Sequence, residues 1–380
     1  MNTEHPACAK IDEAIAAFPI ETAQNGSLVE RRPYGNGHIN DTFLLRCTSP
    51  DQNETKFILQ RMNHDIFKNP PQLMENVVQV TQHLRRTILS QGGDPNRETL
   101  NVLQTRNGAD WYQDSSQNYW RVFPFIERSV CLEKVESEKD FYDSAVAFGN
   151  FQRQLADFPV RKLHETIPNF HNTSSRFEDF QKAVQEGDKS RAALAQAELE
   201  FALDRKQDTA VLTNLLAEGK LPLRVTHNDT KLNNILFDAD THKALCIIDL
   251  DTVMPGLSLY DFGDSIRFGA NTGAEDETDL SKVELDLSLF EAFTKGYLEG
   301  CAGSLTPKEI EMLPMGAKLM TYECGIRFLA DFLTGDHYFK THREHHNLDR
   351  ARTQFKLVAD MEAKWHDMTA IVKKYENPAK

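Results

Sequence analysis

The segment VTHNDTKLNNILFD (residues 225–238) constrains the fold of this chain more than any other stretch. It places His227, Asp229 and Asn234 in a short polar run, directly before residues that are apolar enough to form a strand. A second apolar run, KALCIIDLD, follows closely and brings Asp249 to its end. We therefore expect a loop beside these strands that carries several polar side chains to one place.

These residue types suit one kind of chemistry. The amide oxygen of Asn234 and the carboxylate of Asp249 are hard ligands of the kind that Mg²⁺ prefers. Asp229 lies a few residues upstream, where a loop can aim its carboxylate at a substrate hydroxyl. Phosphoryl transfer needs such a set, and protein kinases space their catalytic loop as H-x-D-x4-N. The short motif alone also fits caps and turns, but its combination with the strand that ends in Asp249 favours a catalytic site.

Composition bounds the class of protein. The chain has 380 residues, which is long for one ordinary domain and predicts two lobes. Its net charge of -14 argues against a nucleic-acid or anionic-membrane surface, because such surfaces need clustered Lys and Arg. The six scattered cysteines include no C-x-x-C pair, which indicates reduced thiols. We find no signal peptide and no apolar run of about 18 residues, so we expect a cytoplasmic protein; its oligomeric state stays open.

The hydrophobic pattern changes character near residue 127. Before it, alternation predicts strands at residues 38–47, 55–62, 100–105, 110–114 and 119–127, and one amphipathic helix at 73–89. After it, helical spacing dominates at residues 140–158, in a long stretch at 191–219 and from 281 onward, with a loop at 164–180. We predict an α+β fold with a sheet-rich, nucleotide-binding lobe at 1–126 and a mostly helical lobe at 127–380.

The first lobe offers a candidate nucleotide site. Gly35 and Gly37 lie between apparent strands, where flexible backbone lets N–H groups approach phosphates, although a plain hairpin turn fits equally well. There is no Walker A motif. Arg61 stands where a kinase-like lobe carries a strand cation, and Glu75 of the next helix is its candidate partner. The alternative is a surface arginine and a helix-start carboxylate.

The run WRVFPFIE resembles the strand and hinge that join two kinase lobes. Pro124 removes one backbone donor there, but the backbone of Phe123 and Phe125 is left to meet adenine. A core strand is the simpler alternative.

The stretch HNDTKLNNILFD…IIDLDTVMPGLSLYDFGDSIRFGA resembles the aminoglycoside phosphotransferase/choline kinase superfamily, and it looks closest to the bacterial N-acetylhexosamine 1-kinases. The runs GNGHINDTF, FILQRMNHDIF, IPNFHNTSSRF and GIRFLADFLTGDHYFK also look like that subgroup, so the resemblance spans residues 30–345. It implies a protein-kinase-like, two-lobed fold that uses ATP and Mg²⁺. Asp229 would then be the catalytic residue, with His227 bracing its loop, while Asn234 and Asp249 would bind Mg²⁺.

The resemblance also points to an acceptor pocket. Asp251 would be a second layer behind the metal site or a substrate contact, while Arg327 and Tyr338 match positions that the subgroup uses around the sugar. His171, Asn172 and Arg176 form a polar loop that offers hydrogen bonds to a hexosamine; the list of substrate-binding candidates is therefore Asp229, Asp251, Arg327, Tyr338, His171, Asn172 and Arg176. An Arg327–Asp331 ion pair within one helix is the structural alternative. The sequence departs from the relatives at Asn228, where glycine is common, and at Arg61, where lysine is common.

The leading hypothesis is an ATP- and Mg²⁺-dependent kinase that phosphorylates the anomeric hydroxyl of N-acetylglucosamine or N-acetylgalactosamine. One alternative keeps the fold and changes the acceptor to an aminoglycoside, choline, homoserine or another small alcohol; the acidic run at residues 273–286 keeps it open. Another is a nucleotide-binding pseudokinase. Neither nucleic acid nor a membrane is expected as a partner.

Overall fold

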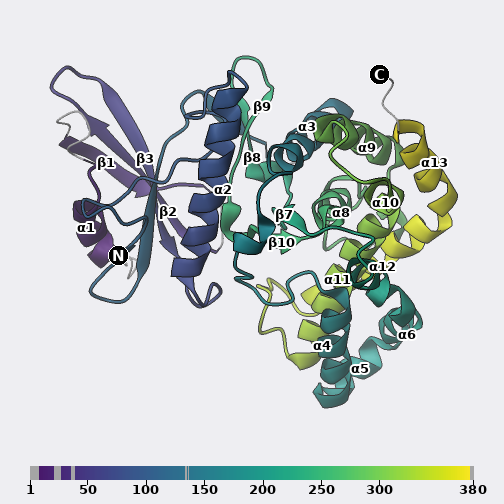
Figure 1. The fold of residues 1–380 in the computed structure, drawn as a ribbon. Helices are drawn as coiled ribbons and strands as arrows, with labels where there is room; N and C mark the ends of the chain where they lie inside the picture. Colours follow the sequence, from purple (N-terminus) through teal and green to yellow (C-terminus); the bar gives the residue numbers. More distant parts are fainter. Residues whose placement is uncertain (1–7, 21–26, 36–38, 133–134, 136, 377–380) are drawn as a thin grey trace.

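The computed structural model describes residues 8–20, 27–35, 39–132, 135 and 137–376. A small antiparallel sheet forms the N-terminal part of the chain, and a larger, mostly helical part follows it (Figure 1). This arrangement confirms the predicted fold class. The boundary at residue 127 stays a prediction. In the part of the chain that the structure describes, every helix is too short or too polar to cross a membrane.

The N-terminal sheet has five strands in the order β1-β2-β3-β5-β4, and all neighbours are antiparallel. The strands are β1 Ser27–Pro33, β2 Asp41–Thr48, β3 Glu54–Met62, β4 Tyr112–Gln113 and β5 Tyr119–Pro124. Successive side chains of a strand point to opposite faces of the sheet, so each face has its own set of residues.

One helix covers each face of this sheet. Helix α1 (Cys8–Ala17) packs Ile11 against Leu59 and Trp120 on one face. Helix α2 (Pro70–Ser90) packs its apolar stripe against the other face and against the large lobe. Asn69 caps α2 by accepting the N–H of Gln72, and prolines fill its first turn, where no N–H is needed.

The large lobe packs helices around short strands (Figure 1). Its helices are α3 Glu138–Gln154, α4 Thr173–Glu186, α5 Lys189–Leu194, α6 Gln196–Asp204, α7 Val211–Ala217, α8 Ser258–Gly269, α9 Leu287–Cys301, α10 Pro307–Glu311, α11 Leu313–Thr334, α12 His346–Ala363 and α13 Trp365–Tyr375. Its strands are β6 Ser129–Cys131, β7 Arg224–Thr226, β8 Ile235–Asp238, β9 Ala244–Ile247 and β10 Met254–Gly256. Helix α8 is buried along most of its length between α9 and α11, and its Phe262 is fully buried.

A buried ion pair fixes the base of β7. Arg224 donates to Glu309 through Nε at 2.5 Å and Nη2 at 2.7 Å. Glu309 also accepts the hydroxyl of Ser258, at the start of α8, and the N–H of Thr306, with which it forms the capping box of α10. Burial raises the pKa of Glu309, but the hydrogen bonds from Arg224, from the N–H of Thr306 and from the hydroxyl of Ser258, together with the charge of the guanidinium, outweigh burial and lower that pKa overall.

Some predicted elements are wrong in detail. Residues 100–105 form no strand, although Leu103 donates one backbone hydrogen bond to Val122. The long helical stretch at 191–219 is divided into α5, α6, a 3₁₀ turn and α7. Helix α4 begins inside the predicted loop at 164–180 because the Asn172 side chain caps it. Strand β1 and helix α1 carry too short an apolar pattern to have been predicted.

Candidate active site

Two carboxylates of helix α8 hold the loop after β7 by hydrogen bonds. Buried Asp261 accepts the backbone N–H of His227 at 3.0 Å and of Asn228 at 2.8 Å. One turn later, Asp264 accepts the N–H of Thr230 at 3.1 Å. A carboxylate that accepts backbone N–H groups holds them firmly, so the loop takes its position from the core of the large lobe.

His227 is fully buried between Phe148 and Phe151. Its Nε2 lies 2.8 Å from the backbone oxygen of Ile248, the residue before Asp249. The ring therefore joins the two loops of the site and does not reach a substrate. This contact agrees with a bracing role and not with direct catalysis.

Asn228 has φ of +65°, in the left-handed region that disfavours most side chains. Asparagine tolerates this conformation better than bulkier residues, and its Nδ2 donates to the backbone oxygen of Thr252 at 2.8 Å. The backbone conformation thus explains how asparagine can stand where the resembled family often has glycine.

Asp229 lies in a small polar cluster at the mouth of this loop. Its Oδ1 pairs with Lys231 Nζ at 2.7 Å, and its Oδ2 accepts Nδ2 of Asn234 at 3.1 Å. Enclosure lowers the pKa of Lys231, but the charges of Asp229 and Asp264 outweigh it and raise that pKa. The ammonium therefore stays charged beside Asp229. Sequence reasoning missed Lys231, although a cation two residues after the key aspartate was the available signal.

Asp249 follows β9 in a left-handed conformation, with φ of +58°. Its side chain has no hydrogen bond or ion pair with any described residue. Its enclosure by protein, followed by repulsion from Asp251 and Asp229, raises its pKa to about 6. Bringing a divalent cation to this carboxylate would relieve that repulsion.

The donor set fits Mg²⁺. Asn234 uses its Nδ2 to bond Asp229, and its Oδ1 receives no hydrogen bond from the described residues. The backbone oxygen of Asn234 accepts the N–H of Ile248 at 2.9 Å, which keeps the two loops together. Within the described ranges, no three His, Cys, Asp or Glu side chains gather to form a metal site alone. One amide and one carboxylate match a cation that is completed by phosphate oxygens and water.

The predicted Arg61–Glu75 pair is wrong. Arg61 donates to Asp41 through Nε at 2.6 Å, and it also contacts Asn118. Glu75 instead lies 2.6 Å from Nε2 of His164. The reason is strand alternation, because Arg61 shares the face of β3 that carries Leu59 against α1, while the opposite face lies against α2 and the large lobe.

The predicted substrate contact of Asp251 is also wrong. Its side chain is only 3% exposed, and Oδ1 lies 2.5 Å from Nη1 of Arg121. Its Oδ2 accepts Nδ2 of Asn40 at 2.6 Å. Both oxygens therefore face protein, and the side chain belongs to the layer behind the metal loop.

The structure supports only part of the predicted nucleotide contacts at the glycine turn (Gly35 and Gly37) and at the hinge (Phe123 and Phe125). Gly35 has φ of +78° with open space around it, as a turn close to a ligand requires; Gly37 lies outside the described residues. Phe123 buries its ring in the core, and the N–H of Phe125 donates to the backbone oxygen of Lys56 at 2.9 Å. The N–H of Phe125 is thus already used, which corrects its assignment as a donor to adenine.

His171 and Asn172 make hydrogen bonds that support the loop after β7 and the start of α4. His171 faces Glu323 through Nδ1 at 2.8 Å and the backbone oxygen of Asn228 through Nε2 at 3.2 Å. Asn172 caps α4 and accepts the N–H of Ser175. Both ring nitrogens of His171 and the amide oxygen of Asn172 are engaged. Their predicted contacts with a substrate are therefore replaced by bracing roles.

Arg327 and Arg176 lie close to each other, near His171 and Glu323. Arg327 follows Glu323 by one turn of α11, and its guanidinium lies 5.5–5.8 Å from the ring centres of Phe170, Tyr338 and Phe339. Among the described residues it has no carboxylate partner. Burial first, and then the charge of Arg327, lower the pKa of Arg176, so the two cations lie close to each other.

The expected Arg327–Asp331 ion pair does not form. Asp331 accepts the backbone N–H groups of His337, Tyr338 and Phe339 and the amide of Asn347. This carboxylate therefore organises the loop that carries Tyr338, and it leaves Arg327 without an acid.

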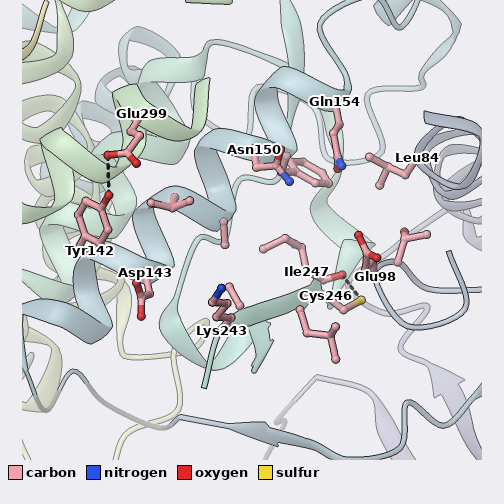
Figure 2. A pocket seen from close by; sticks show the side chains of 16 residues that line it. Leu84, Glu98, Tyr142, Asp143, Asn150, Gln154, Lys243, Cys246, Ile247 and Glu299 are labelled. Atoms are coloured by element: carbon pink, nitrogen blue, oxygen red, sulfur yellow. Dashed lines mark hydrogen bonds between the residues drawn. The ribbon is translucent and has the colours of Figure 1, made fainter. Parts of the chain in front are cut away.

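A cavity of about 580 Å³ lies away from these loops, between α2, α3, α9 and β9 (Figure 2). Its lining includes Leu84, Asn150, Gln154, Lys243 and Ile247, and it includes neither Asp229 nor Asp249. The candidate active site is thus defined by the two loops and not by this cavity.

The model of the phosphotransferase enzyme family (APH) matches residues 30–293, which is more than half of the chain. The chain belongs to this family. The match includes both loops of the polar cluster and the small-lobe sheet except for the first three residues of β1.

Solved structures resemble this phosphotransferase over nearly its whole length. An aminoglycoside phosphotransferase from Alicyclobacillus acidocaldarius is 12% identical with a TM-score of 0.59, over 99% of this chain and 97% of that chain. An amicoumacin kinase in complex with AMP-PNP and Ca²⁺ is 12% identical with a TM-score of 0.57, over 95% and 94%. A choline kinase from Cryptosporidium parvum is 14% identical with a TM-score of 0.53, over 97% and 98%. At these identities the likeness shows the fold.

Proposed function

We propose that this phosphotransferase is a cytoplasmic small-molecule kinase that transfers the γ-phosphoryl group of ATP to the anomeric hydroxyl of an N-acetylhexosamine, giving the sugar 1-phosphate. The cluster of Asp229, Lys231, Asn234 and Asp249 supports the reaction type. The complex of the similar amicoumacin kinase with AMP-PNP and Ca²⁺ supports an adenine nucleotide and a divalent cation.

Each group has a role in that transfer. The carboxylate of Asp229 orients the acceptor hydroxyl and takes its proton as the hydroxyl oxygen attacks the γ-phosphorus and the bond to the ADP oxygen breaks. Asn234 and Asp249 would hold Mg²⁺, which when bound would neutralise charge on the phosphate oxygens. Lys231 supplies a second positive charge on the acceptor side. His227 and Asp261 keep the loop in place.

The acceptor class rests on the pair of arginines. Arg327 has aromatic neighbours and no acid, and Arg176 lies near it. A polycationic antibiotic or choline would be repelled by this pair, because like charges in a partly dry pocket cost free energy. A neutral sugar with an acetamido oxygen offers acceptors to arginine and an apolar ring face to Tyr338 and Phe339.

The acidic run at residues 273–286 no longer favours a cationic acceptor. Glu275 pairs with Arg267 at 3.1 Å, and Asp276 lies 2.9 Å from Nε2 of His346. Asp286 caps α9. These acids serve the protein's own cations and helix ends, so they form no open anionic pocket.

The test is ADP release from Mg·ATP with N-acetylglucosamine, N-acetylgalactosamine, their 1-O-methyl glycosides, choline and an aminoglycoside. Activity on the free sugars and none on the 1-O-methyl forms would establish anomeric phosphorylation. Activity on choline or the aminoglycoside alone would overturn the acceptor assignment. Nucleotide binding without ADP release from any acceptor would favour the pseudokinase alternative.

We expect Lys231→Gln to lower kcat by about 10²–10³-fold, the usual effect of removing one group that stabilises transition-state charge. The KM of the acceptor should change little, since Lys231 acts on charge that develops during transfer. Steady-state kinetics of Lys231→Gln are compared with those of the control variant Lys220→Gln. Lys220 is an exposed lysine that pairs with Glu218. A kcat within about threefold of the wild-type value would remove Lys231 from the mechanism.

A further inference from the structure

Arg121 is a cation of the small-lobe sheet that the sequence prediction did not consider, because the predicted strand cation was Arg61 of β3. It lies on β5 directly opposite Gln60 of β3, and Arg61 lies opposite Trp120. Because alternate residues share a face, Gln60 and Arg121 lie on the face toward α2 and the large lobe, whereas Arg61 lies on the face toward α1. Arg121 is therefore a buried cation on the inner face of this sheet, whereas Lys56, which shares that face, is partly exposed and pairs with Glu127.

Arg121 is tied to several elements at once. Its Nε donates to Oε1 of Gln60 at 3.0 Å, and its Nη1 lies 2.5 Å from Asp251 and 3.9 Å from the sulfur of Met74 on α2. The side chains of Arg121 and Asp251 are only 2% and 3% exposed. The pair thus lies inside the protein, between the small sheet and the metal loop.

Asp251 extends this link to Asn40. Its second oxygen accepts the amide of Asn40, and Oδ1 of Asn40 accepts the N–H of Asn63 at 2.9 Å. Asn40 follows Gly35 in the turn between β1 and β2, and Asp251 follows Asp249 by two residues. One carboxylate therefore fixes the metal loop relative to both the sheet and Asn40, the residue before β2.

Stability alone is a weak reason for such a pair. Removing two charges from water is costly, and replacing a buried ion pair by apolar groups is often neutral or stabilising. A directional, two-sided contact is better suited to fixing geometry, because guanidinium and carboxylate groups bond along defined directions.

We propose that Arg121 acts as a positioning residue of this phosphotransferase: through Asp251 it fixes the metal loop relative to the small-lobe sheet and to Asn40, so that nucleotide phosphates and Mg²⁺ meet in register. The inference rests on the proposed function, since it concerns the same Mg·ATP site. It differs from a direct phosphate contact because both partners are buried.

The test separates position from stability. Arg121→Met combined with Asp251→Asn removes both charges and keeps an oxygen for Asn40; the matched control is Arg61→Met with Asp41→Asn, which neutralises the half-exposed pair on the other face of β3. Each protein is measured for thermal unfolding and for binding of Mg²⁺ with a non-hydrolysable ATP analogue by calorimetry. The KM values of Mg·ATP and acceptor are then compared.

We expect the Arg121→Met/Asp251→Asn variant to unfold cooperatively and to keep the acceptor KM of the wild type. It should bind the Mg²⁺-loaded analogue about tenfold more weakly, which is the usual size of the energetic coupling between neighbouring residues. The control pair should match the wild type. Arg121→Lys keeps the charge without the bond to Gln60, so its affinity for the analogue should lie between those of the double variant and the wild type. If the double variant fails to fold, this single variant tests the proposal.

Two results would overturn the inference: unchanged nucleotide binding by a folded inner variant, or a rise in acceptor KM alone, which would make Asp251 a substrate contact. A wild-type protein that binds no Mg²⁺-loaded analogue would instead remove the proposed function, and calorimetry distinguishes this outcome before any variant is made.

Discussion

Asp229→Asn should lower kcat by about 10²–10⁴-fold, the range expected when a proton-transfer group is lost from a transition state. The amide keeps the size of the side chain and one oxygen to face Lys231, while the bond from Nδ2 of Asn234 is lost. The loop should keep its shape because Asp261 and Asp264 hold its backbone. What disappears is the negative charge that orients the hydroxyl and takes its proton. Binding of Mg·ATP should therefore change far less than turnover.

Steady-state kinetics and calorimetry on the same preparation separate these effects. Asp240→Asn is the matched control, because Asp240 lies in an exposed turn of the same region and pairs with Arg128 at the surface. If Asp229→Asn kept near-normal kcat while binding fell, Asp229 would belong to the metal site and the assignment of roles would be reversed.

Glu309→Ala should destabilise the protein by about 3–5 kcal/mol, because it leaves Arg224 buried without its partner. The change also removes the capping box of α10 and the acceptor for Ser258 at the start of α8. Since α8 carries the carboxylates that hold the catalytic loop, the free energy of unfolding and the activity at elevated temperature should fall together.

Urea unfolding measures this difference. Glu311→Ala is the control: Glu311 is exposed, pairs with Lys308 at the surface and should cost less than about 1 kcal/mol. The pKa of Glu309 is lowered in the folded state, so its contribution is present above the ordinary carboxyl pKa and lost as pH falls through the lowered value. The gap between wild type and variant should narrow in acid. A gap independent of pH would mean that packing, not the charge, is lost.

The sequence could predict that the polar residues of the candidate site lie on adjoining loops, because this signal is local. His227, Asp229, Asn234 and Asp249 lie within a short stretch, and spacing alone brings them to adjoining loops. The same holds for the amphipathic helix that became α2, whose stripe repeats over several turns.

The predicted pairing of Arg61 with Glu75 was wrong because the sequence does not show which face of the sheet Arg61 occupies. A shift of one residue, from Gln60 to Arg61, moves a side chain to the other face of the sheet. Arg121 meets Asp251 only through tertiary packing of the lobes, and no spacing rule connects them. For the same reason the bracing roles of His171 and Asp331 became visible only from their partners, Glu323 and the turn at His337.

The hydrogen bonds that hold the loop after β7 to α8 also affect the local opening of the molecule. The amide hydrogens of His227, Asn228 and Thr230 are bonded to Asp261 and Asp264, which are almost fully buried. Solvent can exchange these hydrogens only when the centre of the large lobe opens, so their protection should approach that of the most stable cooperative unit. The residues that perform the chemistry would then be among the last to loosen, and adaptation to new acceptors would have to come from the loops around Arg176 and Tyr338.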